Sequence, residues 1–287
     1  MRGGNPSPTN TTTTMLQKFS TYLLCIKGYS QRTAQEYCKD LHYFARWMRL
    51  YRADAKWSNI TRKDIDAYII QRVKEGCKPT TTNRELASIS ALYRYFIREG
   101  LLTNNPARFQ SRRKVEEKTP NTIPNEDLQR AYEGTTGLVH VWIGLLATTG
   151  IRISELLSLR WEDIDFKSNS LEIVGKGRKE RIVYTTAEHL ELLKQAYERS
   201  PRTGRIFDYE QRTARHMLWM ALKPFSRAKQ LSPHAIRHSF ATNLANNGVN
   251  VTTIATILGH NRIATTQKYI DMSQANTQAV TAQYSIL

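Results

Sequence analysis

Apolar side chains recur at helical spacing through the first hundred residues of this chain, and this periodicity constrains its fold more than any other feature. Leu41, Phe44 and Met48 mark one face of a helix that begins near Ser30. The capping-box pattern T-x-x-D, which starts at Thr61, predicts a helix that runs to about residue 76. This part of the chain is therefore expected to be helical throughout.

Two more helices are expected beside these, one near residues 16–26 and the other from Pro79 onward. The four helices define a first domain over residues 15–108. Residues 1–14 are rich in Gly, Pro, Asn, Ser and Thr, and we expect a disordered tail there. Met15 follows this tail directly, so the sequence leaves open whether Met15 is the true start.

A linker is predicted over residues 109–124, which mix charges with two prolines and show no period. The second domain covers residues 125–287. Residues 171–174 and 180–184 alternate in polarity and flank the residues GKGRK, which predicts a β-hairpin. Helices are expected from Asn125 and at 138–148, 187–198, 211–226, 233–246, 251–258 and 264–270. The predicted fold class is mainly α, with two domains and one small antiparallel sheet.

Positive charge dominates the chain and indicates a polyanionic partner. The net charge is +17, from 42 Lys and Arg against 25 Asp and Glu. Residues 1–108 carry 18 basic and 8 acidic groups, whereas residues 125–287 carry 20 and 15. Binding to phosphates releases condensed counterions, so nucleic acid is the expected partner. A membrane surface is the rival polyanion, but the sequence holds no basic amphipathic helix with an aromatic face.

The cysteines and the apolar segments point to a protein of the cytoplasm. Cys25, Cys38 and Cys77 have neither a C-x-x-C pair nor metal-ligand spacing, so we expect free structural thiols. No apolar run approaches the roughly 20 residues that span a bilayer. The first residues lack the apolar region of a secretory signal. We therefore expect no membrane partner.

Six residues in the second half of the chain supply the groups that cleavage of a phosphodiester needs without metal. They are Arg152, Lys176, His234, Arg237, His260 and Tyr269. The two arginines would clamp the phosphate oxygens with permanently charged forks. The tyrosine would attack phosphorus, and His234 would take the phenolic proton as general base. Lys176, between two glycines at the hairpin tip, would protonate the departing 5′ oxygen, and His260 would hydrogen-bond a phosphate oxygen.

Each of these residues has a structural interpretation when it is taken alone. An arginine can form a surface salt bridge, a hairpin-tip lysine can be solvated, and a histidine can fill a structural role. His234 and His238 stand four residues apart and could pair on a metal, but the sequence offers no H-E-x-x-H motif and no obvious third ligand. We therefore expect no metal site, and we expect His238 to pack or to bond the backbone.

Further polar residues are expected to contact DNA. The helix that starts at Pro79 opens with hydroxyl, amide and guanidinium groups, which meet phosphates or base edges in DNA-binding proteins. The linker and the hairpin add basic groups. The set is Thr80, Thr81, Thr82, Asn83, Arg84, Arg112, Arg113, Lys114 and Arg178. A polar first helical turn and a solvated linker are the alternatives.

The motifs TGIRISEL, HAIRHSFATNL and LGHNRIATTQKYI, in this order and spacing, resemble the active-site boxes of tyrosine recombinases of the phage integrase family. The compact Xer-like branch is the most similar in layout, and the resemblance spans essentially residues 15–287. It implies a helical, SAM-like core-binding domain and a catalytic domain that close as a clamp around duplex DNA. The roles given above to the six residues are the roles that the resemblance implies.

The resemblance also implies a reaction and its partners. The expected intermediate is a 3′-phosphotyrosine with a free 5′ hydroxyl, which attacks the partner strand through a Holliday junction. The expected substrate is a double-stranded site with inverted half-sites, bound by a homo-tetramer that is a monomer when free, with no cofactor. Integration or excision of a mobile element is the expected role. Xer-type resolution of chromosome or plasmid dimers is the alternative.

Two alternative functions, a topoisomerase and a non-catalytic DNA-binding protein, share some of these features. A type IB-like topoisomerase shares this chemistry but acts alone, which the core-binding layout argues against. A non-catalytic DNA-binding protein would have no need to retain all six residues. The target DNA sequence cannot be read from these motifs, because specificity lies in base contacts.

Overall fold

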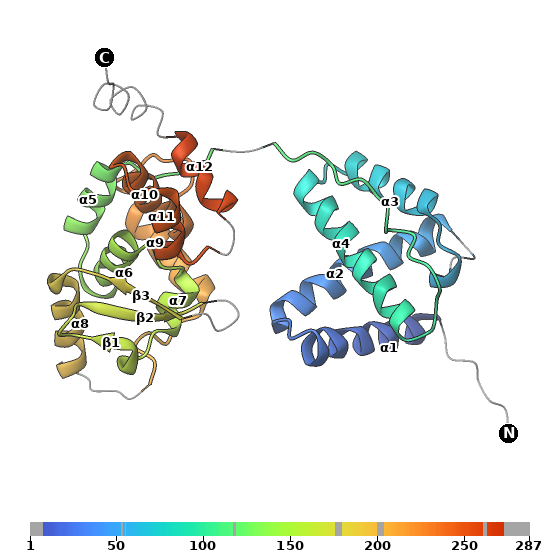
Figure 1. Ribbon diagram of the computed structural model, residues 1–287, viewed down its shortest axis with the longest axis horizontal. Coiled ribbons are helices and arrows are strands. Elements are labelled where there is room, and N and C mark those ends of the chain that lie inside the picture. Colours follow the sequence, from blue (N-terminus) through green and yellow to red (C-terminus); the bar gives the residue numbers. More distant parts are fainter. Residues whose placement is uncertain are drawn as a thin grey trace, which may run out of the picture. The chain divides into compact units, whose positions relative to one another are not determined.

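The chain forms two compact units, Met1–Glu117 and Lys118–Leu287. We describe them from a computed structural model that covers residues 8–52, 54, 56–116, 119–175, 180–199, 204–260 and 263–272. Each unit has its own hydrophobic core. The mainly helical fold class that the periodicity predicts is confirmed (Figure 1). Among the described residues, no helix combines the length and the apolar character that crossing a membrane requires.

The first unit consists of helices that wrap a core of aromatic and aliphatic side chains. Its elements are α1 (Pro8–Thr21), the π-helix η1 (Tyr22–Ile26), α2 (Gln31–Tyr51), the 3-10 helix η2 (Trp57–Asn59), α3 (Arg62–Lys74) and α4 (Pro79–Arg98). The Ser30 hydroxyl caps α2, and the capping box of Thr61 with Asp64 starts α3. Leu41 and Phe44 of α2 are fully buried, as their spacing predicts.

The expected disordered tail over residues 1–14 is wrong from Pro8 onward, because α1 begins there. Proline fits the first position of a helix, since its fixed φ suits the turn and its missing N–H would have no partner there. The threonines that follow belong to a helix that buries Leu16 and Phe19 further along. Packing of this later face outweighs the low helix propensity of threonine.

The second unit surrounds a central helix with further helices and one sheet. Its elements are α5 (Asn125–Glu133), α6 (Gly137–Thr149), α7 (Ile153–Ser158), η3 (Trp161–Asp163), β1 (Ile164–Asp165), β2 (Ser170–Val174), β3 (Glu180–Tyr184), α8 (Ala187–Arg199), α9 (Gln211–Leu222), α10 (Pro233–Asn246), α11 (Val251–Leu258) and α12 (Ala264–Met272). Apolar residues surround α6 on nearly every side, and Trp142, Ile143 and Leu145 are fully buried, as in a core helix.

The sheet is antiparallel in the order β1-β2-β3 (Figure 1). Leu171 of β2 pairs with Val183 of β3, and both are buried, whereas Glu172 and Ile182 face solvent. This alternation confirms the predicted pair of strands. The sequence did not predict β1 or α7. With two and six residues, these elements are too short for their periodicity to be recognised.

Candidate active site

Two helix ends, each closed by a glycine, bring Arg152 and His260 together. α6 ends at Gly150 with φ +62°, and α11 ends at Gly259 with φ +63°, a left-handed backbone that favours glycine. A Cβ on Gly150 would also lie 2.4 Å from the ring of Phe240. The chain turns sharply at both glycines, and the Arg152 guanidinium donates to the Gly259 carbonyl at 3.4 Å.

Arg237 of α10 ties these two helix ends to each other. Its Nη1 donates to the Gly150 carbonyl at 2.5 Å, and its Nη2 donates to the Leu258 carbonyl at 2.6 Å. The side chain is almost fully buried. Burial, aided by the nearby charge of Arg152, lowers the pKa of Arg237 to about 10, so the group still carries its charge at neutral pH. The phosphate-clamp candidates thus share one rigid framework.

Glu155 is the buried carboxylate of this framework, and the sequence interpretation missed it. It accepts hydrogen bonds from the backbone N–H of Arg152 at 2.8 Å and from Nη1 of Arg152 at 2.7 Å. It also accepts two bonds from Arg181 of β3, at 3.2 and 2.8 Å. Burial works against the charged carboxylate, but the bonds from Arg181 and Arg152 outweigh it and lower the pKa of Glu155. The spacing of Arg152 and Glu155, three residues across a helix start, was the available signal.

Arg181 connects the sheet to α11 as well as to Glu155. Its Nε donates to the Ile257 carbonyl at 3.0 Å, two residues before the glycine that ends α11. The strand that follows the predicted hairpin tip is therefore fixed to the helix that leads to His260. The tip residues Lys176 and Arg178 lie outside the described residues.

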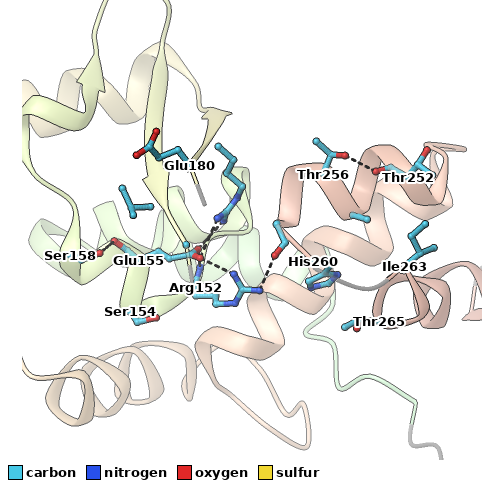
Figure 2. A pocket seen from close by; sticks show the side chains of 15 residues that line it. Arg152, Ser154, Glu155, Ser158, Glu180, Thr252, Thr256, His260, Ile263 and Thr265 are labelled. Atoms are coloured by element: carbon cyan, nitrogen blue, oxygen red, sulfur yellow. Dashed lines mark hydrogen bonds and ion pairs between the residues drawn. The ribbon is translucent and has the colours of Figure 1, made fainter. Parts of the chain in front are cut away.

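A cavity of about 1060 Å³ opens beside this framework. Figure 2 shows Arg152 and Glu155 on one side of it, and Thr252 and Thr256 of α11 on another, with His260 between them. Its lining includes five serine and threonine residues and the guanidinium groups of Arg152 and Arg181, beside the carboxylates of Glu155 and Glu180. Such a wall offers hydrogen-bond donors to phosphate oxygens at a positively charged centre.

Tyr269 lies on α12 with its ring buried at 2% exposure. The ring packs on Ala241, Ile254 and Leu258, in a small apolar cluster separate from the main core. Its hydroxyl lies 2.7 Å from Nδ1 of His238. His238 packs against the rings of His234 and Tyr269, as expected, but its Nδ1 bonds the phenol and not the backbone. The contact spans 31 residues of sequence, so spacing alone could not reveal it.

The remaining histidines of the set differ in their surroundings. His260 is half-buried, and its Nδ1 lies 2.8 Å from the Thr266 hydroxyl. Burial and the charges of Arg237 and Arg152 lower its pKa to about 4. His234 is exposed on the first turn of α10, and its ring forms no hydrogen bond with another described residue. Partial burial and nearby arginines, Arg215 foremost, lower the pKa of His234.

These low pKa values predict that acid weakens the second unit. His238 and His260 titrate at about 4 when folded and near 6.5 when unfolded, so the unfolded chain binds more protons between these limits. Stability is full above pH 6.5 and falls as the pH drops to about 4. Each half-buried ring contributes at most about 1 kcal/mol per pH unit.

Urea unfolding at pH 7.5, 6.0 and 5.0 measures this effect. The variant with both His238→Asn and His260→Asn should lose less stability than the wild type over that range. Its remaining slope reports the other groups of lowered pKa that titrate in this range, His189 and His234 among them. Equal slopes for the two proteins would contradict the assignment.

Four of the expected DNA contacts are engaged within the first unit. The Asn83 amide exchanges two hydrogen bonds with the backbone of Arg113, at 2.9 and 2.8 Å. Thr82 is buried, and the Arg113 guanidinium reaches its hydroxyl and the Cys77 carbonyl. Arg84 donates to Glu36 and to the buried Asp40, both at 2.7 Å. The exposed or half-exposed candidates that remain are Thr80, Thr81, Arg112 and Lys114.

Arg84→Ala is accordingly expected to act on stability. It leaves Asp40, which is fully buried, with the hydrogen bond from the Ser88 hydroxyl at 2.8 Å. We expect a loss of about 1–3 kcal/mol in urea unfolding, because Arg84 itself is partly exposed and solvent compensates in part. Arg94→Ala, at an exposed position of the same helix, should unfold like the wild type. An Arg84→Ala protein of unchanged stability but weaker DNA binding would reverse this interpretation.

A known family model matches each of the two units. The model of the phage integrase family matches residues 125–276, and the model of the phage integrase N-terminal SAM-like domain matches residues 16–100. Tyrosine recombinase XerD of Oceanobacillus iheyensis is 29% identical, over 94% of this chain and 97% of its own. Tyrosine recombinase XerC of Listeria innocua is 28% identical, over 92% and 94% of the two chains.

Solved structures share the fold. XerH site-specific recombinase bound to a palindromic difH substrate superposes with a TM-score of 0.70 at 20% identity, over 93% of this chain and 83% of that one. A lambda integrase tetramer bound to a Holliday junction gives a TM-score of 0.70 at 18% identity, over 95% and 83%. At identities of 18–20%, these superpositions show that the fold is shared.

Proposed function

Because this chain belongs to the phage integrase family, we propose that it is a site-specific recombinase that cleaves and rejoins duplex DNA through a bond to Tyr269. One observation carries the proposal. Arg152, Arg237 and His260 converge at the ends of α6 and α11, where hydrogen bonds from the two arginines join the chain, and Tyr269 packs on α10 and α11. Residues from three separate motifs thus meet where one phosphate would be held.

The proposed cleavage needs no cofactor. Arg152 and Arg237 hold the non-bridging oxygens of the phosphate, and His260 adds a donor. The Tyr269 oxygen attacks phosphorus and forms a 3′-phosphotyrosine, while the bond to the 5′ oxygen breaks. Lys176 protonates that oxygen, and the family pattern gives the base role to His234. The covalent bond keeps the energy of the phosphodiester, so the 5′ hydroxyl of a partner strand can reverse the reaction.

The proposed assembly is a homo-tetramer on a site with inverted half-sites, with a Holliday junction as intermediate. The lambda integrase tetramer on a Holliday junction supports it by its shared fold. The positive charge of the first unit, with Thr80, Thr81, Arg112 and Lys114 as contacts, supports backbone binding. We place the reaction in the cytoplasm. Arg178 is a further proposed contact at the hairpin tip.

The proposed biological role is integration or excision of a mobile element. The match to relatives named XerD and XerC favours resolution of chromosome or plasmid dimers as the second candidate. The position of the cleaved sites separates the two roles. Sites at both ends of an element beside the gene support the first, and one site on the chromosome away from such an element supports the second.

Covalent capture from sheared DNA of the source genome tests the proposal. The protein should retain DNA after denaturation in detergent, and the captured strands should carry a free 5′ hydroxyl that polynucleotide kinase labels without prior phosphatase. Sequencing of the captured ends gives the target site. Capture of equal amounts by the Tyr269→Phe variant, or a 5′ end blocked by protein, would refute the proposed chemistry.

A further inference from the structure

We propose that His238 is a catalytic residue that accepts the phenolic proton of Tyr269 during strand cleavage, the role that the family pattern gives to His234. The inference rests on the proposed function, because it assigns one proton transfer within that reaction. Three features carry it: the contact with the phenol, the exclusion of water from that phenol, and the position of His234.

The contact joins two packed helices. Nδ1 of His238 on α10 lies 2.7 Å from the Tyr269 hydroxyl on α12, and the ring centroids are 5.7 Å apart. The distance is that of a good hydrogen bond between heteroatoms. A general base must reach the proton that it removes at this range, and His238 does so.

Bulk water is excluded as the acceptor of this proton. Tyr269 is 2% exposed, and its ring is enclosed by Ala241, Ile254 and Leu258. Within the part of the chain that the structure describes, the hydroxyl has no other hydrogen-bond partner. The proton of a buried phenol must leave through the polar atom that it touches, and that atom is Nδ1 of His238.

His234 stands in a different place. It lies one turn before His238 on α10, with a centroid distance of 6.4 Å between the two rings. Its ring is exposed, and it forms no described hydrogen bond to Tyr269. An exposed ring on the same helix face suits a donor to the DNA phosphate better than an acceptor for a buried phenol.

The protonation state of His238 suits an acceptor. Burial, together with the charges of His234, Arg237 and Lys268, lowers its pKa to about 4, so the ring is neutral at pH 7. A neutral ring with its hydrogen on Nε2 presents a free lone pair at Nδ1, and the phenol donates to it. A DNA phosphate would offset the surrounding positive charge and raise the basicity of the ring when it is needed.

The step balances without any further reactant. The phenolic O–H bond breaks and its proton moves to Nδ1 of His238, while the oxygen of Tyr269 bonds to phosphorus. The bond from phosphorus to the 5′ oxygen breaks, and Lys176 protonates that oxygen. In rejoining, the 5′ hydroxyl gives its proton to Lys176 and its oxygen attacks phosphorus. The bond from phosphorus to the Tyr269 oxygen then breaks, and His238 returns its proton to the released phenol.

Two substrates distinguish the removal of the phenolic proton by His238 from the protonation of the departing 5′ oxygen by Lys176. The captured target sequence is made as a nicked suicide duplex with either oxygen or sulfur at the bridging 5′ position of the scissile phosphate. Sulfur departs without a proton, since a thiol has a pKa of about 8.5. Under single turnover, His238→Ala should form adduct about 100-fold more slowly than the wild type with both substrates. Lys176→Ala should form adduct slowly on the oxygen substrate, and the sulfur substrate should restore its rate.

A conservative variant separates proton transfer from placement of the phenol. His238→Asn keeps an amide oxygen that can accept the phenolic hydrogen bond, but it cannot take the proton. It should therefore stay about 100-fold slow while it binds DNA and melts like the wild type. Added imidazole should accelerate His238→Ala and leave Tyr269→Phe inactive. His216→Ala, at an exposed histidine of α9 that stacks on Trp219, is the matched control and should react at the wild-type rate.

Several results would overturn the assignment. They are wild-type rates in His238→Asn, restoration of His238→Ala by sulfur, or a large loss in His234→Ala that imidazole restores while His238→Ala reacts normally. Adduct formation by Tyr269→Phe would instead overturn the proposed function. The two failures therefore give different results in the same assay.

Discussion

Arg237→Ala is expected to form the covalent adduct about 100- to 1000-fold more slowly than the wild type, as when one preorganised donor is lost from an oxyanion site. The guanidinium would neutralise the phosphate in the transition state. It also joins the Gly150 and Leu258 carbonyls at 2.5 and 2.6 Å, so its loss loosens the two helix ends that carry Arg152 and His260. Single-turnover cleavage of the nicked substrate measures the rate.

The same variant should lose stability, because two buried carbonyls lose their donor at about 1–3 kcal/mol each. Arg237→Lys keeps the charge, but one ammonium cannot reproduce the fork that spans both carbonyls, so it should be nearly as slow. Arg212→Ala, at an exposed position of α9, is the matched control. A folded Arg237→Ala protein that cleaves within about tenfold of the wild-type rate would contradict the clamp.

Glu155→Ala is expected to destabilise the second unit by about 3–5 kcal/mol, because it leaves two guanidinium groups at a buried site without their shared carboxylate. Glu155 is 6% exposed and binds both Arg152 and Arg181. Cleavage should fall as well, since the carboxylate fixes the direction of Arg152. Glu155→Gln retains part of the hydrogen bonding and should lie between the wild type and the alanine variant.

Urea unfolding and adduct formation are measured on the same preparations of these variants. Glu162→Ala removes an exposed carboxylate that pairs with Arg160 at the surface, and it should unfold like the wild type. Equal stability of Glu155→Ala and Glu162→Ala would show that the buried pairing does not hold the framework together.

The sequence predicted those elements whose periodicity runs over at least two turns. α10 and α11 have the bounds expected from the pattern, Pro233–Asn246 and Val251–Leu258, because a serine or asparagine caps each start. Helix α1 begins earlier than expected, since a threonine-rich turn gains its order from the apolar face that follows it.

The site could be predicted only as far as local motifs extend. Arg152, Arg237, His260 and Tyr269 lie in three dense motifs, and the fold brings these motifs together. Contacts between distant residues were out of reach, as with Glu155 and Arg181, which lie 26 residues apart. The same holds for His238. The sequence around His238 suggested a structural role. Its contact with the phenol of Tyr269 depends on how α10 packs against α12, which the sequence does not show.

The most direct test of Tyr269 as the nucleophile is the identity of the residue that carries the DNA. The covalent complex on a nicked suicide substrate is digested with nuclease and trypsin, and the modified peptide is sequenced by mass spectrometry. We expect one nucleotide-bearing peptide, with the phosphodiester on Tyr269 and a 3′ linkage. A phosphodiester on any other residue, or a complex of undiminished yield from Tyr269→Phe, would contradict this assignment.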